Sequence, residues 1–427
     1  MSSFGTVTTH QLENGLKILT KEVHATPVVS LYIWYRVGAR NERPGLTGIS
    51  HWVEHMLFKG TKKFPKETLK RVIEGNGGRW NGFTSMDYTA YYEVLPADKI
   101  EVGLALEADR MQNSIFDPEE VENERTVILS ERAGAENSPE FSLREEVQAT
   151  AYKAHPYQWG IIGWNSDLQT MTRDDLYGYY QRCYVPNNAI LVMVGDFTTD
   201  RLMEQVKAHY LHLPAGQPIG NPTTVEPPQR GERRGTVRKE GQLAYVSIAY
   251  HIPPASDADL YPLDVLSTIT SSGKISRFYR ELVDRQIATS AYLSPTFSKD
   301  AGLAWVTAEA CADISAEQLE VSLLEQMDRL QNDLVSEEEL TRAIRQTEAQ
   351  FIFAMDSVSS QAAQIGYYET LVSYNYLNTY LDQIGSVTPS QLRDTAQKYF
   401  GADNRTVGHF IPLLPEIGSS TGASEIA

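Results

Sequence analysis

Two histidines and a glutamate stand close together in the pentapeptide His51-Trp52-Val53-Glu54-His55. If this segment is helical, the four-residue spacing puts both imidazoles on one face, roughly 6 Å apart, near enough for both to bind one metal ion. Glu54 lies beside them, where its carboxylate could take a proton from a water molecule in the metal's open coordination position. The pentapeptide therefore predicts a metal site with an adjacent general base.

The residues around the pentapeptide favour a helix. Thr47 is expected to be the N-cap, the run to Lys59 contains no proline, and Gly60 follows as a stop signal. The simpler alternative is a buried helix with one hydrogen-bonded histidine and no metal. A third ligand decides between the two interpretations.

A catalytic zinc site uses three protein ligands and leaves the fourth position to water. Asp117 and Pro118 form the start signal of a second helix, which is expected to run towards Ala135. Glu124 and Glu131 lie on one face of this helix, about two turns apart. Periodicity alone does not choose between them and the other acids of the segment, which also fit a solvated first turn: Glu119, Glu120 and Glu122.

Together with further segments, these residues resemble the pitrilysin family of zinc metallopeptidases, which includes the insulin-degrading enzymes and the mitochondrial processing peptidases. The order His-x-x-Glu-His is that of the inverted zinc motif. Other matching segments follow in the family's order: Val37–Glu42, His55–Thr61, Tyr184–Asn188 and Val194–Phe197. The resemblance therefore spans most of the chain.

The resemblance implies a role for each residue of the site. It makes His51 and His55 two ligands of one zinc ion per chain, and Glu54 the general base. The third ligand falls on Glu131, which stands at the family's spacing after His55. The family's second helix acid falls on Glu124, a catalytic residue that is expected to support the metal site electrostatically without binding the metal.

A substrate-binding strand is predicted after the glycine-rich segment Gly75–Gly78. The residues that follow resemble the family's edge strand, on which a peptide adds as an extra strand through main-chain hydrogen bonds. Gly82 stands where alanine is usual in the family. An ordinary hairpin is the alternative interpretation of the predicted strand residues, which are Asn81, Gly82, Phe83 and Thr84.

One departure from the family concerns its substrate-binding arginine and tyrosine, which stabilise the oxyanion of the reaction. In the register of the resemblance, Val283 and Ser290 occupy these two positions, so both groups are missing. Arg280 or Arg285 with Tyr292 could replace them only if the register shifts.

The resemblance also implies a partner chain, because family chains of this length form half of a clamshell. The missing arginine and tyrosine favour a heterodimer with a second family chain, although a homodimer is possible.

The chain organisation indicates a duplication. The 427 residues, 41% of them hydrophobic, suffice for two or three domains. Proline and glycine gather in a predicted linker at 216–235, which separates a zinc-bearing domain at 1–215 from a domain at 236–427 without the metal motif. Three residues of the first half recur in the second half with one constant offset: Thr172, Tyr184 and Asn188 as Thr388, Phe400 and Asn404.

Strands and helices cluster within each half and do not alternate strictly. Apolar runs at 27–37 and 243–251 predict buried strands, and Ser315 with Gln318 and Ser336 with Glu339 predict capping boxes at helix starts. These patterns indicate an α+β fold with mainly antiparallel sheets. The resemblance implies two homologous α/β-roll domains.

Composition excludes several partners. A net charge of −17 argues against nucleic acid or an anionic membrane as the main partner. No apolar run approaches twenty residues, and Met1–Phe4 begins neither a secretory signal nor an Arg-rich transit peptide. Cys183 and Cys311 cannot form a disulfide framework, which fits a reducing compartment. The sequence therefore predicts a cytoplasmic protein, unless a presequence has already been removed from it.

The function predicted from these residues is zinc-dependent hydrolysis of unfolded peptides inside a chamber formed with a second chain. The sequence is compatible with a dedicated processing peptidase as well as with a general degrader. The alternative is a metal-free or inactive family member that serves as a structural subunit. The intact set of His51, Glu54, His55 and Glu131 argues against that alternative.

Overall fold

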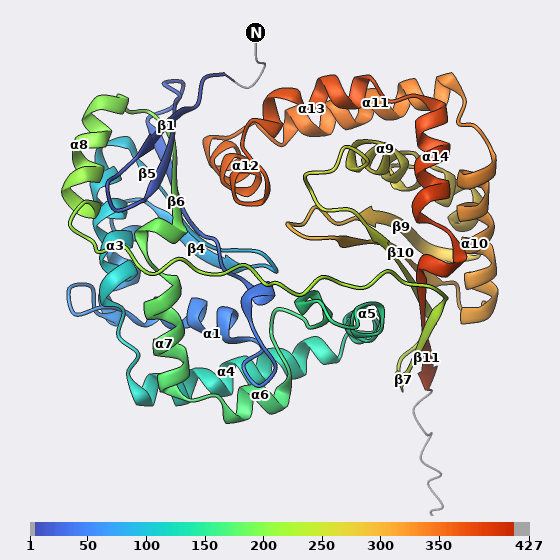
Figure 1. Cartoon of the computed structure of the whole chain (residues 1–427), viewed down its shortest axis with the longest axis horizontal. Helices are drawn as coiled ribbons and strands as arrows, with labels where there is room; N and C mark the ends of the chain where they lie inside the picture. The colour runs from blue at the N-terminus through green and yellow to red at the C-terminus, as the bar shows by residue number, and fades with distance from the viewer. Residues whose placement is uncertain (1–4, 414–427) are drawn as a thin grey trace, which may run out of the picture.

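The computed structural model describes residues 5–413 as two β-sheets covered by helices (Figure 1). Residues 1–4 and 414–427, which belong to the outer ends of the two predicted domains, lie outside the described residues. The strands of the first sheet come from residues 8–195 and those of the second from 233–413. The predicted α+β class is confirmed.

The first sheet has six strands in the order β1-β2-β6-β3-β5-β4. Only β2 and β6 pair in parallel, and every other pair is antiparallel. Strand β4 lies at the edge, paired on one side with β5. The strands are β1 (Thr8–Gln11), β2 (Lys17–Glu22), β3 (Val28–Tyr35), β4 (Arg79–Thr84), β5 (Thr89–Pro96) and β6 (Ala189–Gly195).

The second sheet repeats this topology in the order β7-β11-β8-β10-β9. Here β7 pairs in parallel with β11, as β2 does with β6 in the first sheet, and the other pairs are antiparallel. The sheet order therefore agrees with the duplication, and β9 is the counterpart of β4. The strands are β7 (Arg233–Glu240), β8 (Tyr245–Ile252), β9 (Ala288–Pro295), β10 (Gly302–Ala310) and β11 (Arg405–Leu413).

Most predicted helix starts are present. Asp117 accepts hydrogen bonds from the main-chain N–H groups of Glu119 and Glu120, and a complete capping box forms at Ser315. Complete boxes also form at Thr172 and Thr388, the recurring pair of the duplication. The box predicted at Ser336 is only half formed, because Glu339 binds Arg277 and does not reach back to the cap.

The α-helices in the described residues are α1 (Ile49–Met56), α2 (Lys66–Glu74), α3 (Ile100–Asn113), α4 (Pro118–Glu136), α5 (Pro139–Ala151), α6 (Asn165–Thr170), α7 (Arg173–Cys183), α8 (Thr199–Tyr210), α9 (Leu260–Ser271), α10 (Ala316–Asn332), α11 (Glu337–Phe353), α12 (Val358–Leu371), α13 (Tyr376–Gly385) and α14 (Pro389–Tyr399).

The start of α1 differs from the prediction. Thr47 does not cap the helix, because its hydroxyl donates to Asp167 Oδ2 at 2.8 Å. The cap position is Gly48, with φ of +87°, a left-handed conformation that glycine adopts without steric cost. The buried carboxyl group of Glu42 instead accepts the N–H groups of Gly48 and Ser50, at 2.8 and 2.9 Å. A residue outside the helix therefore satisfies its first donors.

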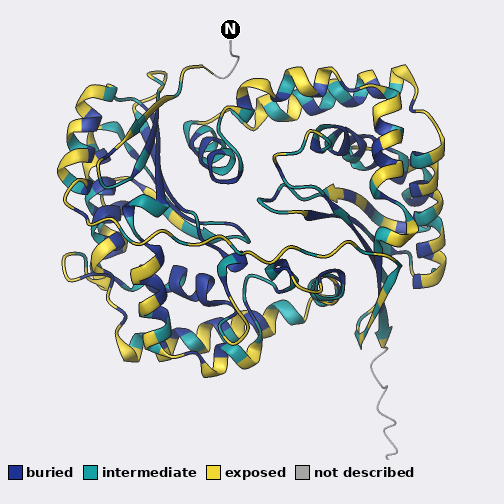
Figure 2. Cartoon of the chain, in the orientation of Figure 1, coloured by how far each residue is buried: buried dark blue, intermediate teal, exposed yellow. Residues whose placement is uncertain are grey.

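The two halves exchange helices. Helix α12, from the second half, packs on β3 and β6 of the first sheet, and α5, from the first half, packs on β7, β8 and β11 of the second sheet (Figure 1). Buried residues line the faces of both sheets and the sides of α5 and α12 that meet them, whereas exposed residues follow the outer helices (Figure 2). Neither sheet is covered by its own half alone.

A glycine permits the close approach of α12 to the first sheet. A Cβ atom at Gly366 would lie 2.0 Å from Nε1 of the buried Trp34 on β3. We expect Gly366→Ala to lower the free energy of unfolding by about 1–3 kcal/mol, because extra volume in a packed core forces neighbours to shift. Denaturant unfolding measures the change.

The control for this prediction is Gly178→Ala on the exposed side of α7, where a new Cβ meets nothing within 4 Å. That substitution is expected to be neutral or stabilising by up to about 1 kcal/mol, because alanine favours the helix. Equal effects of the two substitutions would contradict the close packing of α12 on β3.

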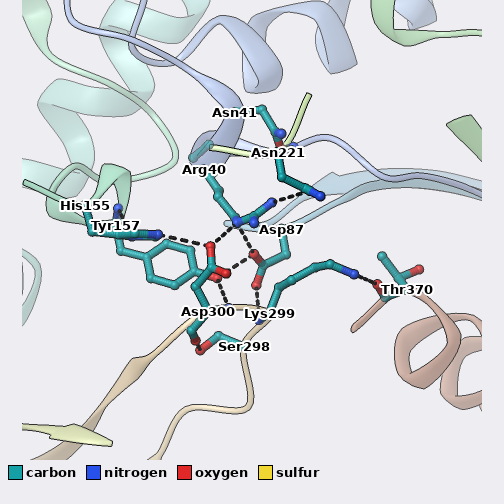
Figure 3. A network of polar contacts seen from close by, with 12 residues as sticks. Arg40, Asn41, Asp87, His155, Tyr157, Asn221, Ser298, Lys299, Asp300 and Thr370 are labelled. Atoms are coloured by element: carbon teal, nitrogen blue, oxygen red, sulfur yellow. Dashed lines mark hydrogen bonds and ion pairs between the residues drawn. The ribbon is translucent and has the colours of Figure 1, made fainter. Parts of the chain in front are cut away.

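A buried polar network also joins the halves (Figure 3). Arg40 Nε donates to Asp300 Oδ2 at 2.5 Å, and His155 Nε2 lies 3.0 Å from the same oxygen. Tyr157 donates to Asp87 Oδ1 at 2.5 Å and accepts the main-chain N–H of Asp300 at 3.2 Å. Burial alone would raise the pKa of Asp300, but its hydrogen bonds to His155 and Arg40 hold it well below the usual range. The network fixes the β9–β10 connection against the β4–β5 turn.

The connection between the two halves runs through residues 214–232, which contain no helix or strand (Figure 1). Strand β7 begins at Arg233, which lies inside the predicted linker 216–235. The exact bounds of the linker and of the two domains stay a prediction. None of the helices in residues 5–413 combines the length and the apolar character needed to cross a bilayer.

Candidate metal centre

Helix α1 carries the two predicted histidine ligands one turn apart. Their Nε2 atoms face each other at 3.2 Å, and their ring centroids are 4.5 Å apart. Helix α4 packs against α1 and brings its acids to these rings. Glu131 Oε1 lies 3.8 Å from His51 Nε2, and Glu131 Oε2 lies 3.7 Å from His55 Nε2. The fold therefore assembles the three predicted ligands from two helices.

Glu124 lies on the opposite side of the His55 ring. Its Oε1 is 2.7 Å from His55 Nδ1, and its other oxygen pairs with Lys59. Burial alone would raise the pKa of Glu124, but the hydrogen bonds from His55 and Lys59 lower it, so it stays a carboxylate. A carboxylate at Nδ1 orients the ring with Nε2 facing the metal. This position suits the predicted supporting role of Glu124.

The residues fit a zinc ion. Two nitrogens bound to one tetrahedral ion at about 2.0–2.1 Å lie roughly 3.3 Å apart, close to the observed 3.2 Å. Burial, followed by the charge of His55, lowers the pKa of His51 to about 3, so His51 is neutral, as a metal ligand must be. Two imidazoles and one carboxylate form a typical catalytic zinc set.

Glu54 lies on α1 beside the two histidines. Ligand atoms of His51, Glu54 and His55 all lie within 4.8 Å of one another. The side chain is 7% exposed, and burial is the main reason why its pKa rises to about 6. Thr84 donates to Glu54 Oε2 at 3.4 Å. A carboxyl group with a pKa near neutrality can both accept and return a proton.

The predicted substrate strand corresponds to β4, which lies at the sheet edge directly beside α1. Gly82 is close to the site, because a Cβ there would lie 3.1 Å from Glu54 Oε1 and 2.9 Å from Tyr91 Cδ1. Glycine at this position therefore leaves room for the Glu54 carboxylate. Residues Asn81 to Thr84 line the same cavity as the metal residues.

This cavity has a volume of about 810 Å³ and is bounded by α1, β4, α4, α5 and the segment 160–162. Neither the residues at the family's arginine and tyrosine positions nor their possible replacements line it: Val283, Ser290, Arg280, Arg285 and Tyr292. Arg285 instead pairs with Glu281 at 2.7 Å, and Ser290 and Tyr292 line a smaller neighbouring cavity of about 80 Å³. Among the described residues, no arginine or tyrosine from the second half therefore lines the cavity that holds the metal residues.

Three residues that support the site were not identified from the sequence. Glu42 caps α1, Arg132 joins α4 to Glu145 of α5 at 2.9 Å, and Arg144 lines the cavity from α5. Glu42 stands in the segment Val37–Glu42, which matches the family sequence. That match could have drawn attention to Glu42, but it does not predict that Glu42 caps α1. Arg132 and Arg144 belong to no motif, and only the packing of α5 reveals them.

Comparison with known proteins gives two adjoining family matches. Residues 17–163 match the model of the insulinase family, peptidase family M16, and residues 170–347 match the model described as the peptidase M16 inactive domain. The first match contains every residue of the metal centre. The second covers most of the half that lacks the metal motif.

Individual relatives match over nearly the whole chain. The chain is 30% identical over 395 residues to the zinc protease PqqE of Helicobacter pylori, covering 91% of this chain and 89% of that protein. It is 28% identical over 402 residues to a probable mitochondrial-processing peptidase subunit beta of Arabidopsis thaliana, covering 91% and 75%. A crystal structure of a protease from Helicobacter pylori superposes with a TM-score of 0.93 at 30% identity, covering 95% and 99%.

Proposed function

The chain belongs to the M16 family of peptidases, of the small-subunit type. We propose that it is a zinc-dependent endopeptidase. Its proposed substrates are unfolded peptides, cleaved in a chamber that a second chain completes. The observation that carries the proposal is the convergence of His51, His55 and Glu131, from two helices, with Glu54 beside them.

In this proposal, His51, His55 and Glu131 hold one zinc ion. When bound, zinc polarises a carbonyl group and lowers the pKa of a bound water from 15.7 towards about 7. Glu54 takes the proton from the attacking water and passes it to the leaving amine. Glu124 acts through His55, because its carboxylate fixes the orientation of that ring.

The peptide is proposed to add to the free edge of β4. Within residues 5–413, no side chain hydrogen-bonds the main chain of Asn81, Gly82, Phe83 or Thr84. The counterpart edge strand β9 is blocked, because Ser271 Oγ accepts the N–H of Leu293 at 2.7 Å and Ser267 donates to its carbonyl at 2.6 Å. The contrast supports β4 as the strand that receives substrate, since main-chain pairing requires unsatisfied groups.

The proposal includes a partner chain. Val283 and Ser290 stand where the family has its arginine and tyrosine, and no described residue of the second half lines the cavity as a substitute. We therefore favour a heterodimer in which a metal-free relative supplies this pair, with a homodimer as the other arrangement. A cytoplasmic location is part of the proposal, and it rests on two cysteines that form no disulfide.

The proposal is tested by measuring zinc per chain and cleavage of a quenched fluorescent peptide, for the chain alone and mixed with metal-free family chains. We expect one zinc per chain and strong activity only in a mixture, with light scattering showing one copy of each chain. Zinc-free, inactive protein in every mixture would favour the structural subunit. Full activity from a homodimer would contradict the heterodimer.

A further inference from the structure

The charged groups on the wall of the 810 Å³ cavity are almost all paired. Lys59 pairs with Glu124. Arg132 makes two hydrogen bonds to Glu145, at 2.9 and 3.1 Å. Arg144 differs, because among the described residues it has no hydrogen bond and no ion pair. Glu140 affects its pKa through charge but forms no ion pair with it.

The guanidinium of Arg144 is nevertheless held in place. Its central carbon lies 4.2 Å from the ring centroid of Trp305, on β10 of the second sheet. A guanidinium that is already held against a ring loses less conformational entropy when its N–H groups bind an acceptor. The guanidinium is held there because α5 crosses to the second sheet, and within residues 5–413 its N–H donors have no acceptor.

Arg144 stands where three cavities meet. It lines the metal cavity and two smaller cavities of about 80 Å³ each, which lie between α5 and the second sheet. The side chain is exposed to solvent, yet the surrounding protein lowers the pKa of Arg144 through burial. Both properties are those of a residue on the wall of a deep cleft. A peptide that extends from the metal residues towards the second sheet would pass it.

We propose that Arg144 binds a carboxylate of the peptide substrate, so that the enzyme prefers peptides with an anionic group at the position that reaches it. This inference rests on the proposed function. Arginine is suited to the role because its fork of N–H donors matches a carboxylate and forms two charge-assisted hydrogen bonds. The carboxylate can belong to an acidic side chain or to the C-terminus of a short peptide.

The preference has to arise from local contact. The chain carries a net charge of −17, which repels anions at long range. Salt screens that repulsion beyond about 10 Å, whereas a hydrogen-bonded pair inside a cleft is screened much less. Arg144 is therefore expected to change selectivity among peptides and to add little to the rate of encounter.

The test uses matched peptides that carry glutamate or glutamine at successive positions around one cleaved bond, each with a free or an amidated C-terminus. At one position, we expect kcat/KM to be about tenfold or more higher for the acidic peptide, the scale of a hydrogen bond to a charged group. A preference that follows the free C-terminus instead identifies the terminal carboxylate as the ligand.

Substitutions then connect the preference to the residue. Arg144→Gln is expected to reduce the ratio of kcat/KM for the acidic peptide to kcat/KM for the neutral peptide to about one. Arg144→Lys is expected to keep part of this preference. Arg201→Gln, an exposed position on α8, changes the net charge equally and is expected to leave the ratio unchanged. A wild-type ratio near one, or equal losses for both peptides in Arg144→Gln, would overturn the proposal.

Peptide binding separates this inference from the proposed function. Fluorescence anisotropy with the Glu54→Gln protein measures the affinity for acidic and neutral peptides without hydrolysis. A binding preference that disappears when Arg144→Gln is added supports the carboxylate site, even if the wild-type protein cleaves nothing. Cleavage by the wild type with equal binding of both peptides would leave the peptidase assignment intact and remove the role of Arg144.

Discussion

Glu54→Gln is expected to reduce peptide hydrolysis by a factor on the order of 10³ or more, because proton transfer by a positioned base contributes about 10²–10⁴ and here serves two steps. Glutamine keeps the size of the side chain and can still accept the hydrogen bond from Thr84. It cannot take a proton from water. Steady-state kinetics on a quenched peptide measures the loss.

Zinc content and stability show whether the substitution is specific. We expect Glu54→Gln to retain one zinc per chain, since Glu54 is not among the proposed ligands. The metal-free variant is also expected to be more stable than the metal-free wild type. Burial raises the pKa of Glu54 from 4.5 to about 6, so the wild type loses stability as pH rises through that window, by about 2 kcal/mol at pH 7.

The matched control is Glu119→Gln in the exposed first turn of α4, which is expected to change neither activity nor zinc content. A Glu54→Gln protein with full activity would remove Glu54 from the mechanism. If Glu54→Gln instead loses its zinc, Glu54 is a ligand, which its position within 4.8 Å of both histidines allows geometrically.

The second large effect is loss of the metal. His55→Ala is expected to reduce zinc from about one per chain to near zero and to abolish hydrolysis, because two protein ligands remain where catalytic zinc sites use three. Glu131→Gln is expected to act in the same direction, since it removes the anionic ligand that faces both Nε2 atoms at 3.7 and 3.8 Å. Metal analysis after dialysis measures both.

Glu124→Gln is the graded comparison. It leaves all three proposed ligands in place but removes the carboxylate that holds His55 Nδ1 at 2.7 Å. Loss of such an orienting group costs about 10–100-fold in metal affinity or activity, so excess zinc is expected to restore much of the activity. Excess zinc is not expected to rescue His55→Ala.

Equal zinc affinity in wild type and Glu131→Gln would assign the third ligand to another carboxylate.

The local parts of the site could be predicted from the sequence. The spacing of His51 and His55 places both rings on one helix face through the 3.6-residue period, and Asp117 followed by proline marks the start of α4. The same local rules failed at Thr47. Its hydroxyl found a partner in Asp167, and Glu42 took over the cap, because side-chain hydrogen bonds go to whichever partner the fold brings near.

The choice among the acids of α4 was not local. Glu124 and Glu131 share a helix face with the right spacing, but only the packing of α4 on α1 places one at Nδ1 of His55 and the other at both Nε2 atoms. The resemblance to a family assigned Glu131, and periodicity by itself could not. A helix period fixes which side chains share a face and leaves open what that face meets.

Residue types and spacing are enough to predict the chemistry and its approximate place: two imidazoles and a carboxylate within one helical turn, a second acidic helix, and a duplicated α+β architecture. Only packing between distant segments places each carboxylate at its nitrogen, lets α5 and α12 each cover the other half's sheet, and sets Arg144 against Trp305 with no ion pair among the described residues. The physical reason is that backbone periodicity and capping act over a few residues. Burial of apolar surface has no direction and can join any two complementary faces, however far apart they lie in the chain.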